Sequence, residues 1–444
     1  MGTGDFVDFN NQTGAISLNN EEYLLTIQII RDVKDIGEKD KNSFIQVLDN
    51  DKIKDYSFTS DLAYPITTGT LSFQDVGSYL FSQITADGRT YLAFNLEKIG
   101  SETNGVGVSE TLQKFNHFFL ITKIDMVQRL TEESTFKLTF VSESWYKFNN
   151  YLNFTSEGVK PVYEILQNII KQGQLKLKPN KETKQVDRKQ FFITPTSFNL
   201  LDSIRYLLSI AIDPDNGFYF FIYNHIEDEY ELVSLKQLYS SLESKELEPR
   251  SLMIMPSQHY YPTGVISRQV IHELKELNVN GADTSTELFK PFSFTKYNYI
   301  DRKFTTNDIN FNKLKGTLPN AQGDSFRNNI NEPAKGIIEI GKLNYQREKD
   351  PINNFTYYFS MARAFMWNNV IEFKIYGNVE RKAGEIIFIT VPEADTFHEK
   401  LAGYWYVLRV QHLFNKQTYY NYIQACRVDR KVVETNKELF IQST

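Results

Sequence analysis

The 444-residue chain contains one cysteine, Cys426, so no disulfide can form within it. Its six histidines are widely spaced, and none shows the i, i+4 or HExxH spacing of a helical zinc site. No apolar run approaches the ~18 residues of a membrane-spanning helix, which argues against membrane insertion. The first residues lack the basic and apolar segments of a signal peptide, so we expect synthesis in the cytoplasm.

Basic charge is also in short supply. The chain has 49 Lys and Arg against 55 Asp and Glu, a formal net charge of −6. Proteins dedicated to nucleic-acid binding usually carry a basic patch or stripe, so this balance argues against that class. The most basic stretch, residues 171–189, is interpreted as a solvated connector. A contact with an acidic partner is the alternative for that stretch.

Sequence patterns of known metal and phosphate sites are incomplete. The string DPDNG at 213–217 has glycine at the fifth position of a calcium loop instead of the sixth, so it predicts a turn. The string NGVGVS at 104–109 lacks the lysine of a phosphate-binding loop. His412 lies in a strand pattern, where a structural hydrogen bond is the expected role.

Catalytic side chains are not grouped in a recognisable way either. The carboxylate pair Glu393 and Asp395 and the acidic run 227–229 both lie in predicted hairpin tips, where charge is normally solvated. There is no GxSxG motif, and Cys426 is expected to be a small buried residue. We therefore predict that the protein is not an enzyme, and that it has no cofactor and no metal site.

Aromatic residues are abundant, with 34 Phe and 26 Tyr, and they favour a sheet-rich, well-packed fold. Alternating apolar and polar residues predict strands in the N-terminal part of the chain. These strands cover 22–31, 43–48, 56–59, 64–73, 91–98, 117–129 and 135–142. The last two form a long hairpin, and together the strands predict an antiparallel β domain.

The middle of the chain has helical periodicity. Apolar residues fall on one face of a helix over 161–172, which begins at Pro161, and of a second helix over 198–211, which Ser197 could cap. A hairpin of 217–223 and 230–234 follows, and then a helix over 236–245. This order predicts an α/β domain inserted after the first β domain.

The C-terminal part returns to strand patterns. Four strands are predicted in succession, over 370–377, 385–391, 404–414 and 419–428. Upstream of them the patterns predict strands over 252–255, 265–274 and 337–345 and a buried helix over 355–367, whereas 278–322 has no clear pattern. Because this part also ends in a long hairpin, we expect two related barrels.

The predicted fold class is mainly β with an α+β insertion: two tail-tube-like antiparallel β-barrels and a helix–helix–hairpin domain. The expected units are an N-terminal arm (1–20), a first barrel (21–145), an α/β insertion (146–250), a mixed connector that starts the second barrel (251–336), the second barrel (337–432) and a C-terminal tail (433–444).

A motif in the C-terminal part resembles a known family. It reads G-N, then A-G four residues later, a strand that ends in proline, L-x-G-Y, a long strand with histidine near its end, and a final strand that ends in arginine. The matching residues are Gly377, Asn378, Ala383, Gly384, Pro392, Leu401, Gly403, Tyr404, Val407, Val410, His412, Tyr420 and Arg427. This pattern is similar to the C-terminal part of phage tail (baseplate) hub proteins, which are related to the hub part of type VI secretion spike proteins.

The resemblance implies a structural virion protein. Such a hub connects the tail tube to the central spike and adapts six-fold to three-fold symmetry, with a channel for DNA. It implies a homotrimer in the virion, assembled in the host cytoplasm, with a tail tube protein and a central spike as partners. A tape measure protein and a baseplate wedge are further expected partners, and DNA passes without specific binding.

Two other functions stay open at this stage. The first is receptor or glycan binding through Tyr404, Trp405 and Tyr406, although alternation turns the last two to opposite faces. The second is a tail enzyme that degrades the cell wall. The sequence does not distinguish a contractile, flexible or short tail, or a phage from a bacterial injection particle.

Overall fold

The structure is a computed structural model. It describes residues 14–18, 21–31, 45–77, 79–84, 89–98, 114–129, 133–150, 156–179, 189–193, 197–210, 219–234, 250–254, 270–279, 292–298, 303–309, 334–340, 369–390, 401, 403–415 and 417–427. These residues are mostly in strands, with a few helices, so the prediction of a mainly-β fold is confirmed.

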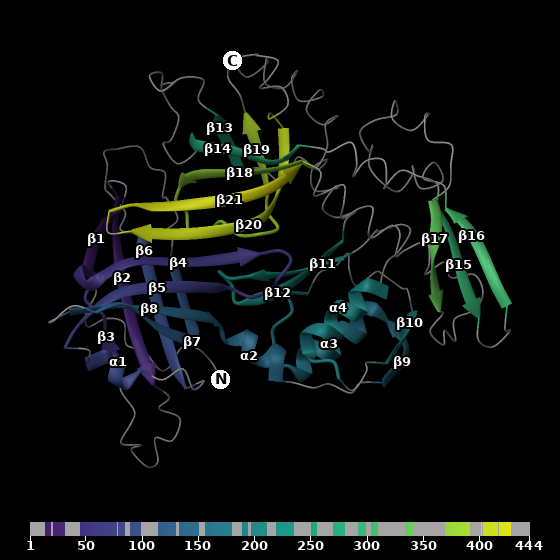
Figure 1. Ribbon diagram of the computed structural model, residues 1–444, viewed down its shortest axis with the longest axis horizontal. Coiled ribbons are helices and arrows are strands. Elements are labelled where there is room, and N and C mark those ends of the chain that lie inside the picture. Colours follow the sequence, from purple (N-terminus) through teal and green to yellow (C-terminus); the bar gives the residue numbers. More distant parts are fainter. Residues whose placement is uncertain are drawn as a thin grey trace, which may run out of the picture.

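The N-terminal strands form a curled antiparallel sheet. Its order is β4-β5-β8-β7-β6-β2, and β1 and β3 pair with the remaining edge of β2. The strands are β1 (Gly14–Leu18), β2 (Glu21–Arg31), β3 (Ile45–Val47), β4 (Ile53–Asp61), β5 (Thr68–Val76), β6 (Thr90–Lys98), β7 (Lys114–Arg129) and β8 (Glu133–Ser142). We call this unit the first barrel (Figure 1). The short helix α1 (Tyr79–Gln83) follows β5.

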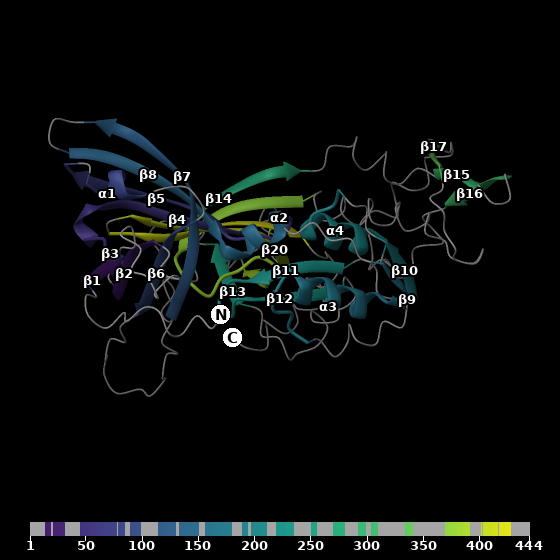
Figure 2. The same cartoon turned by 90° about the horizontal axis from the view of Figure 1, so that it is seen from below.

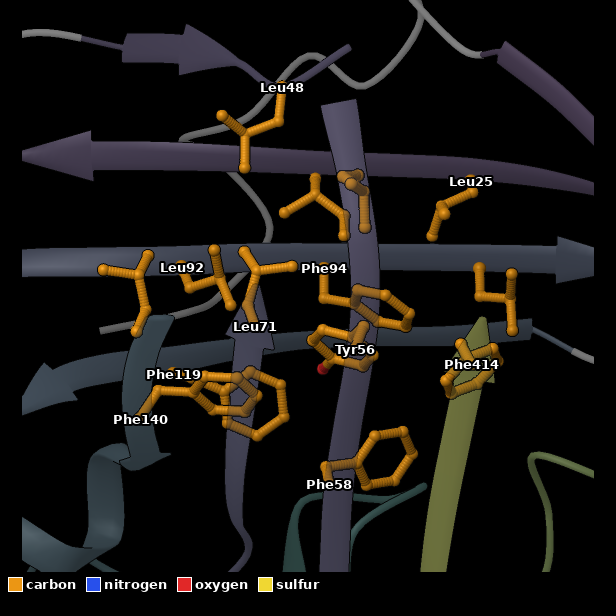
Figure 3. Close-up of a cluster of buried hydrophobic side chains, with 14 of the residues drawn as sticks. Leu25, Leu48, Tyr56, Phe58, Leu71, Leu92, Phe94, Phe119, Phe140 and Phe414 are labelled. Atoms are coloured by element: carbon orange, nitrogen blue, oxygen red, sulfur yellow. The ribbon is translucent and has the colours of Figure 1, made fainter. Parts of the chain in front are cut away.

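Large aromatic side chains fill the first barrel. Tyr56 stacks on Phe94 with ring centroids 4.2 Å apart, and Phe58 stacks on Phe115 at 4.8 Å. These side chains are fully buried, and each contributes on the order of 2–3 kcal/mol through removal of apolar surface from water. Phe414 reaches the same cluster from a strand near the C-terminus (Figure 3).

The C-terminal strands close into a second barrel. The strand order is β14-β18-β21-β20-β19-β13, and β13 pairs back with β14. The strands are β13 (Arg250–Ile254), β14 (Val270–Val279), β18 (Asn369–Tyr376), β19 (Ile386–Thr390), β20 (Gly403–Asn415) and β21 (Tyr419–Arg427). The prediction of an entirely antiparallel barrel is wrong at one strand, because β13 runs parallel to both of its neighbours.

Helices and two-stranded sheets lie between the two barrels in the sequence and beside them in space (Figure 2). They are α2 (Glu143–Asn150), β9 (Ser156–Pro161), α3 (Val162–Gln172), β10 (Lys189–Ile193), α4 (Leu200–Ile210), β11 (Tyr219–Asn224) and β12 (Glu229–Ser234). Pro161, the predicted first residue of this helix, is the N-cap of α3, which begins one residue later. The prediction that Ser197 caps α4 is wrong: Asn199 accepts a hydrogen bond from the Asp202 N–H at 2.8 Å.

Three further strands form a separate small sheet: β15 (Phe292–Asn298), β16 (Lys303–Ile309) and β17 (Ala334–Ile340). The expected placement of the strand near residue 337 in the second barrel is wrong, because β17 pairs with β15. Two of these strands lie in the stretch 278–322, where the sequence has no clear pattern and yields no prediction. The polar composition of β16 explains that omission, since KFTTNDI lacks an apolar face.

Other predictions differ from the structure or lie outside the described residues. The predicted N-terminal arm (1–20) contains β1, which pairs with β2. The predicted helices at 236–245 and 355–367, the strings at 104–109 and 213–217, the residues Pro392, Glu393 and Asp395, and the tail 433–444 all lie outside the described residues. None of the helices in the described part of the chain has both the length and the apolar character to cross a bilayer.

Candidate functional site: the sheet that joins the two barrels

One strand, β20, belongs to both barrels. One of its edges pairs with β21. The other edge is shared: Gly403–Tyr406 pair with β19, and Arg409–Asn415 pair with β4 of the first barrel. The change of partner coincides with a register shift in the β20–β21 pairing, between Val407 and Arg409. A single antiparallel sheet therefore runs β7-β8-β5-β4-β20-β21-β18-β14 through both barrels. Figure 1 shows β8, β5, β4, β20, β21 and β18 as successive strands of this sheet.

The two barrels repeat one strand order. The sequence β4-β5-β8-β7-β6-β2 corresponds to β14-β18-β21-β20-β19-β13, strand for strand in chain order. The first five strands of each series are antiparallel in both barrels, and only β13 is reversed relative to β2. The long hairpin β7–β8 thus corresponds to β20–β21, as the sequence argument for two related barrels requires.

The repeat extends to individual residues. The register shifts between Ile121 and Lys123 on β7, and between Val407 and Arg409 on β20, at corresponding places in the two hairpins. A second pair of shifts is equally matched.

That second pair lies on the strands that begin each series. On β4 the shift falls between Ile53 and Asp55, and on β14 it falls between Ile271 and Glu273. Bulges are specific local features of a sheet, so two coincidences of this kind indicate a true structural repeat.

The family-like motif forms the turn between β18 and β19. A Cβ at Gly377 would lie 2.2 Å from the Tyr419 ring, so only glycine fits. Asn378 accepts a hydrogen bond from the Glu380 N–H at 2.9 Å, which closes the turn. Gly384 has φ +87°, in the region that favours glycine. Between them, the Ala383 N–H donates to the Ser60 hydroxyl on β4 at 3.3 Å, so the turn contacts the first barrel.

His412 is at the centre of the junction and is fully buried. Its Nε2 lies 3.0 Å from the Arg381 carbonyl, which can only accept, so Nε2 carries the hydrogen. Its Nδ1 then accepts from the Tyr419 hydroxyl at 2.8 Å and from the Asn421 amide at 3.0 Å. Burial holds the pKa of His412 well below its usual range, in agreement with a neutral ring. The predicted structural role of His412 is therefore consistent with its surroundings.

The β11–β12 hairpin tip enters the same junction. Burial lowers the pKa of His225 to about 3, so the ring is neutral. Its Nε2 lies 3.1 Å from the Val379 carbonyl in the β18–β19 turn and therefore donates to it. The ring also lies edge-on to Phe58 and to His412. His225 thus ties the inserted hairpin to both barrels.

A third buried histidine, His117 on β7, extends the contact. The Tyr223 hydroxyl donates to Asp228 at 2.8 Å, so His117 Nε2, 3.0 Å away, donates to the Tyr223 oxygen. Burial lowers the pKa of His117 although the Asp228 charge opposes this. The sequence could not reveal this network, because its members come from separate parts of the chain.

The face of the joining sheet opposite the barrel cores carries hydroxyl, amide and charged side chains, with Tyr376, Tyr420 and Tyr422 around Lys374. The Ser57 and Thr70 hydroxyls lie 3.1 Å apart, and Ser72 donates to Asp55 at 2.9 Å. Charged residues of both signs lie on this face by their register, and those with described side chains are Asp55, Asp61, Asp125, Glu273 and Glu372 with Lys123, Lys137, Lys275, Lys374 and Arg409. We call this surface the polar face.

An acidic cluster on β12 and its turn is the one group of this kind among the described residues that could suit a cation. Carboxylate oxygens of Glu227, Glu229 and Glu231 lie within 4.8 Å of one another. The Lys178 ammonium lies 2.9 Å from Glu227, 3.3 Å from Glu229 and 3.5 Å from Glu231. The lysine already supplies the positive charge, and the cluster is best described as an exposed ion-pair network.

The remaining candidate residues have structural surroundings. Trp405 is only 2% exposed and donates its Nε1–H to the Leu401 carbonyl, and Tyr406 is fully buried. Neither can stack on a sugar at the surface. Cys426 is buried as predicted, and burial raises the pKa of its thiol.

No family model matches the sequence. No curated protein matches it either. Solved structures do match. A tail protein from Neisseria meningitidis MC58 is similar with a TM-score of 0.54 at 6% identity, over 92% of this chain and 99% of that one. The 43 kDa tail protein of prophage MuSo2 from Shewanella oneidensis is similar with a TM-score of 0.55 at 8% identity, over 91% and 99%. The chain thus has the fold of phage tail proteins, and the resemblance read from the sequence is confirmed at the level of the fold.

Proposed function

We propose that the chain is a tail hub, in which three copies form a ring between a six-fold tail tube and a three-fold central spike. The observation that carries this proposal is the repeat of one barrel within the chain. Three copies supply six equivalent barrels, which match a six-fold tube at one end. The three chains match a three-fold spike at the other, because closed rings of heterologous contacts satisfy both symmetries.

The junction between the barrels supports a rigid ring. Neutral histidines, backbone carbonyls and hydroxyls hydrogen-bond to one another in a buried network, in which His225 Nδ1 has no partner among the described residues. Buried networks of this kind favour one arrangement of the surrounding elements. The continuous pairing of β4 with β20 removes two strand edges that would otherwise be exposed. The two barrels of one chain therefore have a defined orientation, which a symmetry adaptor requires.

The polar face suits the wall of a DNA channel. Phosphate binding depends on a local excess of Lys and Arg, and the described side chains of this face include no such excess. Hydroxyl and amide side chains such as Thr70, Gln411 and Gln424 lie between the charges. DNA would pass along such a surface without being held.

The wider assignments follow from the hub role. The tail tube protein and the central spike are the proposed direct partners, with a tape measure protein and a baseplate wedge as further neighbours. The protein would belong to the virion after assembly in the host cytoplasm. The expected division of the chain, with the second barrel now beginning at β13, remains part of this proposal.

Substitutions on the polar face test the channel. The triple variant Thr70→Arg, Gln411→Arg, Gln424→Arg adds positive charge to the proposed wall, and we expect normal assembly with slower DNA ejection. A control, Gln167→Arg, places one arginine on the exposed side of α3 and should change nothing. Normal ejection from assembled triple-variant particles would show that this face does not line the channel.

The alternatives have less support. Trp405 and Tyr406 are buried, and the half-buried Tyr404 packs edge-on against Phe388, so these three side chains do not form the exposed platform that glycan binding needs. A glycan array tests that reading directly. Zymography on peptidoglycan tests for a cell-wall hydrolase, and clearing of the substrate would overturn the non-enzymatic role.

A further inference from the structure

Strand β7 has an edge that the described residues leave unpaired. Its first part, up to Leu120, pairs with β6 on one edge, and Phe119–Arg129 pair with β8 on the other. Beyond Leu120, no described strand pairs with the β6-side edge. The corresponding edge of β20, over Arg409–Asn415, is the one that pairs with β4.

Strand β14 has the complementary edge. One side pairs with β18 from Ile271 to Val279. The other side pairs with β13 only at Val270 and Ile271, and no described strand continues that pairing. The corresponding edge of β4 is the one that pairs with β20. Within the chain, β4 of the first barrel pairs with β20 of the second. The equivalent edges, on β14 of the second barrel and β7 of the first, have no described partner over these residues.

We propose that the edge of β7 over 123–129 pairs in the antiparallel sense with the edge of β14 over 273–279 in a neighbouring copy. This pairing repeats between chains the β4–β20 contact that exists within one chain, and it rests on the ring of the proposed function. The repeat gives the register as far as Met126 and Glu276, since each strand has a further register shift directly after these residues. His412 faces Phe58 within the chain, and the corresponding residues are Met126 and Glu276.

The side chains on the β7 edge support a protein partner. Met126 is 46% exposed and Val127 is 62% exposed, on a strand edge. Natural sheets usually protect such edges with charge, proline or a cover, because exposed apolar edges aggregate. The exposed residues of the β14 edge include Glu273 and Lys275. In the proposed register Lys275 lies diagonally across from Asp125, an attractive charge pair.

Cysteine cross-linking tests this register. Directly opposed residues of an antiparallel pair lie within disulfide range. The only native cysteine, Cys426, is buried and does not interfere. In the double variant Met126→Cys, Glu276→Cys, mild oxidation with copper phenanthroline should give covalent dimers and trimers and nothing larger. A mixture of the two single variants should give dimers alone.

Two controls separate pairing from random collision and from misfolding. The pair Asp125→Cys, Glu276→Cys moves one thiol to the opposite face of β7 and should not cross-link. The variant Val127→Lys places a second positive charge opposite Lys275 in the proposed register and should weaken the assembly, whereas Tyr146→Lys, at a similarly exposed apolar residue of α2, should not.

The outcomes for the strand pairing and for the hub differ. If light scattering gives a trimer but the Met126–Glu276 pair does not cross-link, the proposed pairing is wrong and the hub stands. If the chain stays monomeric even with its spike partner, the proposed function itself is wrong. Cross-linked ladders beyond the trimer would contradict a closed ring.

Discussion

Acidification should lower the free energy of unfolding, and the pKa of His225 at the barrel junction gives the size of one contribution. Burial lowers its pKa to about 3, against an ordinary value of 6.5. The unfolded chain therefore binds a proton at this residue more readily than the folded chain. The stabilisation is fully present above pH 6.5 and is lost as the pH falls from 6.5 toward 3. At pH 4.5 His225 alone lowers the free energy of unfolding by about 2.7 kcal/mol relative to its value above pH 6.5. This figure is 1.36 kcal/mol per pH unit over about two pH units.

The assay is urea unfolding at a series of pH values for the wild type and for His225→Phe. Phenylalanine keeps the ring contact with Phe58 and Phe115 but cannot titrate. Carboxylates and the other histidines contribute to both curves, so the difference between the curves reports His225. We expect the two free energies of unfolding to converge by about 1.4 kcal/mol per pH unit between pH 6 and 4. Parallel curves would refute the argument that His225 is neutral and buried in the folded protein.

Three further predictions test single features. Gly377→Ala should lower the free energy of unfolding by about 3 kcal/mol, because the new methyl group meets the Tyr419 ring. The control Gly77→Ala, at a residue with positive φ and open space, should lower it by only about 1 kcal/mol. Equal losses in urea titrations would contradict the packing argument. Lys178→Met should cost less than about 1 kcal/mol, and the loss should vanish in 1 M salt; a salt-independent loss would mean that packing dominates at this residue. Cys426 should resist a thiol reagent until the protein unfolds, and rapid labelling at neutral pH would show that its strand opens.

The sequence predicts most of the strands because burial on one face imposes alternation. Residues 404–414 alternate clearly, and β20 occupies Gly403–Asn415. The same pattern cannot reveal that β20 changes partners halfway along its length. That change depends on a bulge and on β4, a strand about 350 positions earlier. Strand direction is equally invisible, so the parallel orientation of β13 could not be predicted.

The motif residues illustrate the same limit for the site. Gly377, Gly384 and His412 can be found in the sequence from their turn and strand context, and each has a steric or hydrogen-bonding reason in the structure. His225 and His117 follow no motif, because their partners come from other domains in space. Only the fold brings them to the junction.

The most direct test of the hub is the mass of the purified chain by light scattering, followed by class averages of the particle. The account predicts a trimer with a central channel and six barrels around it. A solid trimer without a channel, or a chain that stays monomeric when its spike partner is present, would contradict the account.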